Sequence, residues 1–175
     1  MGGVEADKEL FSITAEKYGE SYKAHLFEQY KLYVDSADRV SSRRALANTF
    51  FLTIASALLS GGFVLVGTTY ASRSAFNGIG SAAVSLGSLL LAVSWVYALR
   101  SYSQLNAGKF KIIHELESKL PAAPYTKEWK VLGEGKRSEK YLPLTTVEKV
   151  VPLLFIVMYL TMLAVSLYPL LLGFP

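Results

Sequence analysis

The stretch VVPLLFIVMYLTMLAVSLYPLLLGF, from Val150 to Phe174, contains no Asp, Glu, Lys, Arg or His. Two further uncharged stretches precede it, from about Ala47 to Thr68 and from about Gly78 to Leu99. Helices of this length reach roughly 33 to 37 Å, which exceeds the hydrocarbon core of a bilayer at about 30 Å. Because a backbone in lipid must satisfy its own hydrogen bonds, each stretch is predicted to be a membrane-spanning helix. The predicted fold class is therefore all-α with three spans.

The composition favours a membrane protein over a soluble one. Of the 175 residues, 51% are hydrophobic and 18% are charged, and the apolar residues collect in three blocks instead of recurring periodically. The remaining residues are too few to enclose three fully buried helices. The chain has no cysteine, which rules out disulfides and Cys-containing metal sites. Its charged start lacks the apolar core of a signal peptide, so we expect this segment to be retained.

Basic residues predict the orientation of the spans. Apart from Arg73, every lysine and arginine either precedes the first span or lies between Arg100 and Lys149. Since cytoplasmic segments carry the excess of basic residues, the N-terminus and the long loop are predicted to be cytoplasmic and the C-terminus periplasmic. The predicted organisation is a cytoplasmic amphipathic helix over 1–45, a transmembrane hairpin over 46–99, a cytoplasmic helix and loop over 100–149, and a third transmembrane helix over 150–175.

Two cytoplasmic helices carry apolar stripes. From about Ala15 to Arg44, apolar residues recur every three or four positions, and a second helix is expected to continue from the second span until Pro121. A stripe in water must be covered, so these helices are predicted to form a bundle with each other and with copies from neighbouring subunits. The alternative is that the first stripe lies on the membrane surface, which its acidic residues disfavour. The predicted oligomer interface comprises Tyr18, Tyr22, Leu26, Tyr30, Tyr33, Ile112, Ile113 and Leu116.

Small residues are concentrated in the first two spans. Such residues let helices approach closely, and the short connection between these spans makes them antiparallel neighbours. Two interpretations stay open: the serine faces line a water-filled passage, or the small residues serve helix packing, which we favour. The residues concerned are Ser56, Ser60, Gly61, Gly80, Ser81, Ala83, Ser85, Gly87 and Ser88. The spans contain no ionisable group, which disfavours ion-coupled transport.

No catalytic, cofactor-binding or metal site is predicted. His25 and His114 each lack a second nitrogen ligand at helical spacing, and no catalytic triad or carboxylate pair can be assembled. A non-enzyme without a cofactor or a nucleic-acid partner is therefore expected. The alternative is a membrane-associated enzyme, or a nucleotide- or lipid-sensing protein, that holds a phosphate with Glu134, Lys136 and Arg137, although the Walker spacing is absent.

A family resemblance is carried by the segment YKLYVDSADRVSSRRALAN, from Tyr30 to Asn48, which runs into the first span. The loop adds the sequence HELE from His114, Glu128-Trp129, LGEG from Leu132 and YLP from Tyr141. These residues resemble the SLATT type of bacterial membrane domain and, more closely, the RipA family of octameric inner-membrane proteins.

The resemblance implies a homo-octamer in the bacterial inner membrane and, for SLATT relatives, a pore-forming role in nucleotide-linked defence. The third span departs from the two-span SLATT pattern, and no ligand residues carry over. The expected function is a homo-oligomeric ring in lipid, acting as a membrane scaffold or gated pore, whose cytoplasmic region recognises an unknown partner or signal.

Overall fold

The computed structural model describes residues 10–136, 139, 141–142 and 144–173. In chain order its helices are α2 (Ala15–Tyr18), α3 (Tyr22–Ser72), α4 (Ala75–Glu117), α5 (Pro124–Val131) and α6 (Leu144–Leu172), with a 3-10 turn, η1 (Gly133–Gly135), after α5. The helices α3, α4 and α6 are each long and apolar enough to cross a membrane. For the described residues, the prediction of an all-α chain is confirmed, and its three long apolar helices are candidate membrane spans.

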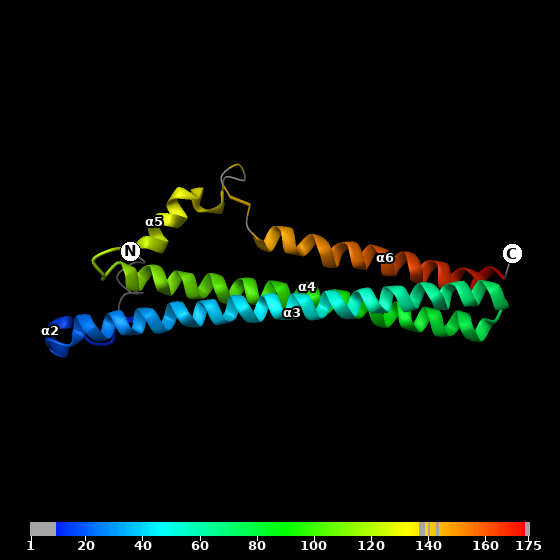
Figure 1. Cartoon of the computed structure of the whole chain (residues 1–175), viewed down its shortest axis with the longest axis horizontal. Coiled ribbons are helices and arrows are strands. Elements are labelled where there is room, and N and C mark those ends of the chain that lie inside the picture. The colour runs from blue at the N-terminus through cyan, green and yellow to red at the C-terminus, as the bar shows by residue number, and fades with distance from the viewer. Residues whose placement is uncertain (1–9, 137–138, 140, 143, 174–175) are drawn as a thin grey trace. The chain divides into compact units, whose positions relative to one another are not determined.

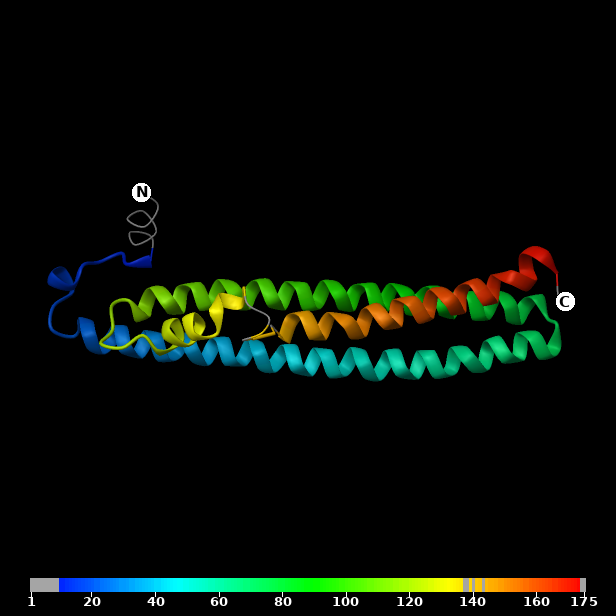
Figure 2. The ribbon, with the colours of Figure 1, turned by 90° about the horizontal axis from the view of Figure 1, so that it is seen from above.

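The chain divides into two compact units, and α3 and α4 contribute to both. The extramembrane unit comprises the residues up to Ser42 together with Gln104–Leu142, and the membrane unit comprises Arg43–Ser103 together with the segment from residue 143 onward. Within the membrane unit, parts of α3, α4 and α6 run side by side (Figures 1 and 2). This arrangement lets each helix bury one side against the other two.

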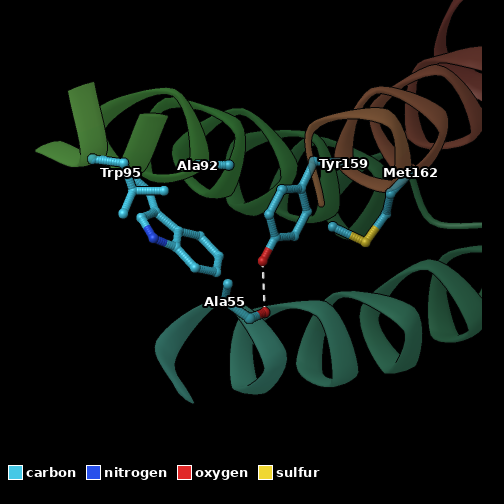
Figure 3. Packing of buried hydrophobic residues seen from close by; sticks show 6 residues of the cluster. Ala55, Ala92, Trp95, Tyr159 and Met162 are labelled. Atoms are coloured by element: carbon cyan, nitrogen blue, oxygen red, sulfur yellow. Dashed lines mark hydrogen bonds between the residues drawn. The ribbon is translucent and has the colours of Figure 1, made fainter. Parts of the chain in front are cut away.

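The core of the membrane unit forms around Trp95 of α4 (Figure 3). The indole ring stacks on Phe51 of α3 with ring centres 5.8 Å apart, and its Nε1 donates a hydrogen bond to the Asn48 side-chain oxygen at 2.8 Å. From α6, the Tyr159 hydroxyl donates to the Ala55 carbonyl oxygen at 2.6 Å. Buried polar groups in an apolar surrounding need such partners, so these bonds fix how the three helices meet.

The turn between α3 and α4 follows from its local sequence. Arg73 has a left-handed backbone with φ of 47°, and the Ser74 hydroxyl accepts a 3.5 Å hydrogen bond from the Asn77 amide. The Asn77 side chain also donates to the Ser72 hydroxyl at 2.9 Å. Serine at a helix start satisfies amides that have no partner within the helix. These contacts close the hairpin that the sequence predicts.

The extramembrane unit differs from expectation at the start of its first helix. The sequence predicts one helix from about Ala15, but Gly19 has φ of 88° and separates α2 from α3. Glycine adopts this backbone without steric cost, so it can end a helix where other residues would continue it. From Tyr22, α3 continues without a break to Ser72, so the N-terminal amphipathic helix and the first span form one helix.

The third span begins earlier than its uncharged stretch. Because α6 starts at Leu144, Thr145 lies within its first turn rather than at a cap position. Glu148 is paired with another helix, as described below. Both Pro152 and Pro169 lie inside α6. The spacing of Thr145 and Glu148 is that of a capping box, but α6 already begins before Thr145.

Candidate functional site

The serines of α4 lie inside the membrane unit. Ser81, Ser85 and Ser88 are each buried, and their spacing places them on one side of the helix. The Ser85 hydroxyl donates to the Ser81 carbonyl oxygen at 2.7 Å, and the Ser88 hydroxyl donates to the Val84 carbonyl oxygen at 2.8 Å. The structure therefore places these three predicted residues at helix packing within one protomer, with their hydroxyls bonded to their own helix.

The other predicted small residues lie on exposed faces. Gly80, Ala83 and Gly87 are on the side of α4 that faces away from the buried serines, and Ser56, Ser60 and Gly61 are exposed on α3. A Cβ atom added at Gly61, Gly80 or Gly87 would meet no atom within 4 Å. In contrast, one added at Gly62 would lie 2.5 Å from the Met162 sulfur. The protomer thus uses Gly62 for close packing and leaves the exposed glycines uncontacted.

A groove between α3 and α6 provides the membrane unit with an apolar recess. It has a volume of about 210 Å³. The Thr161 hydroxyl, its one polar side chain, donates to the Val157 carbonyl oxygen at 3.0 Å. A polar solute would find no free partner there, so the recess suits an acyl chain or an apolar side chain. It is lined by Phe63, Val66, Val157, Met158, Thr161, Met162 and Val165.

An ion pair joins α3 to α6 at one end of the membrane unit. The Arg44 guanidinium donates to the Glu148 carboxylate, and both side chains are largely shielded from solvent. The sequence did not predict this pair. The four-residue spacing that marks local pairs cannot reveal partners 104 positions apart.

The two predicted apolar stripes cover each other within the extramembrane unit. Leu26 of α3 is buried, as are Ile113 and Leu116 of α4. Tyr22, Tyr30, Tyr33 and Ile112 are partly buried, whereas Tyr18 on α2 stays exposed. Lys109 of α4 also donates to the Ser36 hydroxyl at 2.8 Å and lies over the Tyr33 ring. Most of the predicted interface therefore serves pairing of α3 and α4 within one chain.

Among the described residues of this unit, the most enclosed charged group is Glu117, at the end of α4. Its side chain is fully buried and accepts a hydrogen bond from the Tyr30 hydroxyl at 3.1 Å. It also accepts from the Tyr125 and Thr126 amides at 3.0 and 2.9 Å, and from the Thr126 hydroxyl at 2.8 Å. These two amides belong to the first turn of α5, which has no side-chain cap from Ala123. Glu117 thus caps α5 from another helix.

Protonation in this network is shifted by burial and by hydrogen bonding. Burial raises the pKa of the Glu117 carboxyl, but the four hydrogen bonds outweigh that effect and leave its pKa below the usual value. Burial and the bond to Glu117 raise the pKa of Tyr30 to about 12. Glu117 is therefore a carboxylate and Tyr30 a neutral phenol over the physiological range. No pattern in the sequence indicates this arrangement, because Tyr30 and Glu117 are 87 positions apart.

The basic loop carries the residues of the phosphate-binding alternative. Lys136 donates to the Glu134 carboxylate at 2.6 Å, and Glu134 has φ of 55° between two glycines with positive φ. The hydrogen bond from Lys136 lowers the pKa of Glu134, and the same bond raises the pKa of Lys136. Arg137 lies outside the described residues. Within the described part of this loop, Lys136 is thus engaged by the Glu134 carboxylate.

Histidines do not gather with other ligands in the described residues. His25 is bonded through Nδ1 to the Tyr18 hydroxyl at 2.8 Å, and His114 through Nδ1 to the Thr126 hydroxyl at 2.8 Å. Among these residues, no group of three or more His, Asp or Glu side chains is positioned to hold a metal ion.

A comparison with known families decides the classification. Residues 27–168 match the octameric membrane protein family (8xMP). The chain belongs to this family. No curated protein and no solved structure matches the chain. The family name implies a homo-octamer, and the three candidate spans of the chain imply contact with lipid.

The region that matches the family contains both networks described above. It includes Tyr30 and Glu117 in the extramembrane unit and Arg44 and Glu148 in the membrane unit. It begins after Leu26, so the exposed Tyr18 lies outside it. The family-wide part of the chain therefore coincides with the paired helices and the three spans.

Proposed function

We propose that this protein forms a homo-octameric ring in the bacterial inner membrane that serves as a scaffold for its cytoplasmic region. The family match and the three spans support the assembly. The distribution of basic residues supports a cytoplasmic N-terminus and a periplasmic C-terminus. The resemblance of Tyr30–Asn48 to the RipA family supports the bacterial inner membrane.

The main observation that favours a scaffold over a pore is the burial of Ser81, Ser85 and Ser88. Their hydroxyls face the interior of one protomer and bond to their own helix, so they are not available to line a passage between subunits. The spans also contain no ionisable group to attract or select ions. The described extramembrane unit exposes Trp129 and Val131 on α5, which offer an unknown partner an apolar contact.

The subunit contacts in this proposal involve two different faces. A closed ring requires a head-to-tail interface, in which one face of each subunit contacts another face of the next. Small residues that permit close approach suit such contacts between spans. We assign these faces to the exposed Gly80, Ala83 and Gly87 of α4 and to Ser56, Ser60 and Gly61 of α3.

A gated pore is the second candidate, and one observation favours it. Thr49, Thr53, Ser56 and Ser60 form an exposed line of hydroxyls along α3. However, eight helices spaced about 10 Å apart place their axes on a circle roughly 25 Å across, which leaves a lumen too wide for ion selectivity. A conducting ring would need other segments to gate it, whereas a scaffold can enclose lipid.

Liposome leakage separates the two functions. Purified protein is reconstituted into vesicles loaded with ions or a small dye, and native mass spectrometry in mild detergent determines the number of subunits. A scaffold gives octamers that release neither probe. Release that disappears when Ser56 and Ser60 are replaced by leucine would establish the pore instead, and a protein that is only monomeric would overturn both functions.

A further inference from the structure

The short helix α5 depends on one carboxylate for its position. None of its residues is fully buried, and its first turn receives no cap from the preceding Ala123. A helix of this length is unstable in isolation. Its Tyr125 and Thr126 amides instead donate to Glu117 of α4, which in turn holds the Tyr30 hydroxyl of α3. Glu117 is therefore the point at which three helices are joined.

Proton counting fixes the direction of the hydrogen bonds around Thr126. A carboxylate only accepts, so the single hydroxyl proton of Thr126 is donated to Glu117 over 2.8 Å. The Thr126 oxygen must then accept from His114, whose Nδ1 is 2.8 Å away. His114 is thus required to carry a proton on Nδ1. A neutral ring protonated on Nε2 would instead place a lone pair against the Thr126 oxygen.

Two forms of His114 meet this requirement. One is the neutral ring with its proton on Nδ1, and the other is the imidazolium, which always carries that proton. The charged form also places a positive charge close to Glu117, since Nδ1 is 3.8 Å from the carboxylate. The His114 side chain is 29% exposed, so it exchanges protons with water, whereas the Glu117 side chain is fully buried.

We propose that Glu117, Thr126 and His114 form a proton-directed latch that docks α5 onto α4 and tightens when His114 takes up a proton. Among the residues that the structure describes, the other titratable groups that act on the network are Tyr30 and Asp38 from α3 and Tyr125 and Glu128 from α5. Tyrosines and carboxylates do not change charge between pH 8 and pH 6, whereas histidine does. The latch thus makes the presentation of Trp129 on α5 sensitive to mild acidification. Because all three latch residues belong to one chain, the latch does not depend on the number of subunits.

Hydrogen exchange measured by mass spectrometry on the full chain in mild detergent tests the latch. Protection of peptides covering α5 is compared at pH 8 and pH 6, after correction for the intrinsic exchange rates. We expect protection to rise roughly fivefold at pH 6, because the hydrogen bond from His114 to Thr126 becomes charge-assisted and gains about 1 kcal/mol. In Glu117→Gln, protection should fall at least about tenfold at both pH values, because an amide cannot accept all four bonds. Protection equal to that of the unmodified chain would overturn the latch.

Two further variants test the role of the proton. His114→Asn keeps an N–H donor near the Nδ1 position at every pH, so protection should become independent of pH while α5 stays docked. Thr126→Val leaves the carboxylate and both amides in place but removes the hydroxyl that links His114 to Glu117. It should therefore also remove the difference in protection between pH 8 and pH 6. The proton coupling would be overturned if protection of α5 in the unmodified chain did not depend on pH, or if the difference between pH 8 and pH 6 persisted in His114→Asn. His25→Asn is the matched control and should retain the full difference.

Discussion

The Tyr159 hydroxyl on α6 donates a hydrogen bond to the carbonyl oxygen of Ala55 on α3, and both residues are buried in the membrane unit (Figure 3). We expect Tyr159→Phe to lower the stability of the folded protein by about 0.5–1.5 kcal/mol, because the ring packing remains and one bond is lost. Tyr159→Ala should cost about 3–5 kcal/mol, because it also leaves a cavity beside Trp95. Thermal unfolding in detergent measures both losses. An unchanged stability of Tyr159→Phe would show that the hydroxyl contributes nothing beyond the ring.

The Arg44–Glu148 pair should behave as a unit. Removing either charge leaves the other shielded from solvent, so Arg44→Met or Glu148→Met alone should destabilise the protein by about 3–5 kcal/mol. The double variant should recover most of that loss, because two apolar side chains replace two compensating charges. A double-mutant cycle in the same unfolding assay gives the coupling, and additive effects of the two substitutions would argue against a coupled pair.

Substitutions at two glycines should distinguish packing within the protomer from packing between subunits. Gly87→Leu should abolish the octamer but preserve the helical content, because nothing in the protomer lies within 4 Å of its added Cβ atom. Gly62→Leu should instead destabilise the protomer by about 1–3 kcal/mol, because it displaces Met162. Size measurement and circular dichroism distinguish the outcomes. An intact octamer of Gly87→Leu would remove this face of α4 from the interface.

The stability of the extramembrane unit should decline at both ends of the pH range. The folded pKa of Glu117 is below its unfolded value of about 4.3, so its contribution is complete above that pH and is lost as the pH falls through the folded pKa.

The folded pKa of Tyr30, about 12, is above its unfolded value of about 10, so its contribution is complete below pH 10 and is lost as the pH rises through 12. Proteolysis rates of the unit across pH 3–12 report both losses. Tyr30→Phe should reduce the alkaline loss, and an unchanged alkaline profile would contradict this assignment.

The sequence by itself determined the membrane class and the helical character of the chain. The uncharged stretch from Val150 to Phe174 needs no partner to prefer lipid, because transfer from water is nearly additive over the residues of a segment. The continuity of α3 was predictable for a similar reason, since a helix is formed by hydrogen bonds between residues close together in sequence.

Tertiary structure alone decided which polar residues meet. Ser81 and Gly80 are adjacent in sequence and alike in size, yet one is buried and the other exposed. Which side of the helix faces a neighbour depends on all the contacts of the packed unit. The bonds from Tyr30 to Glu117 and from Arg44 to Glu148 join positions far apart along the chain. Such pairs depend on distances in space, which the identity and spacing of residues along one segment do not specify.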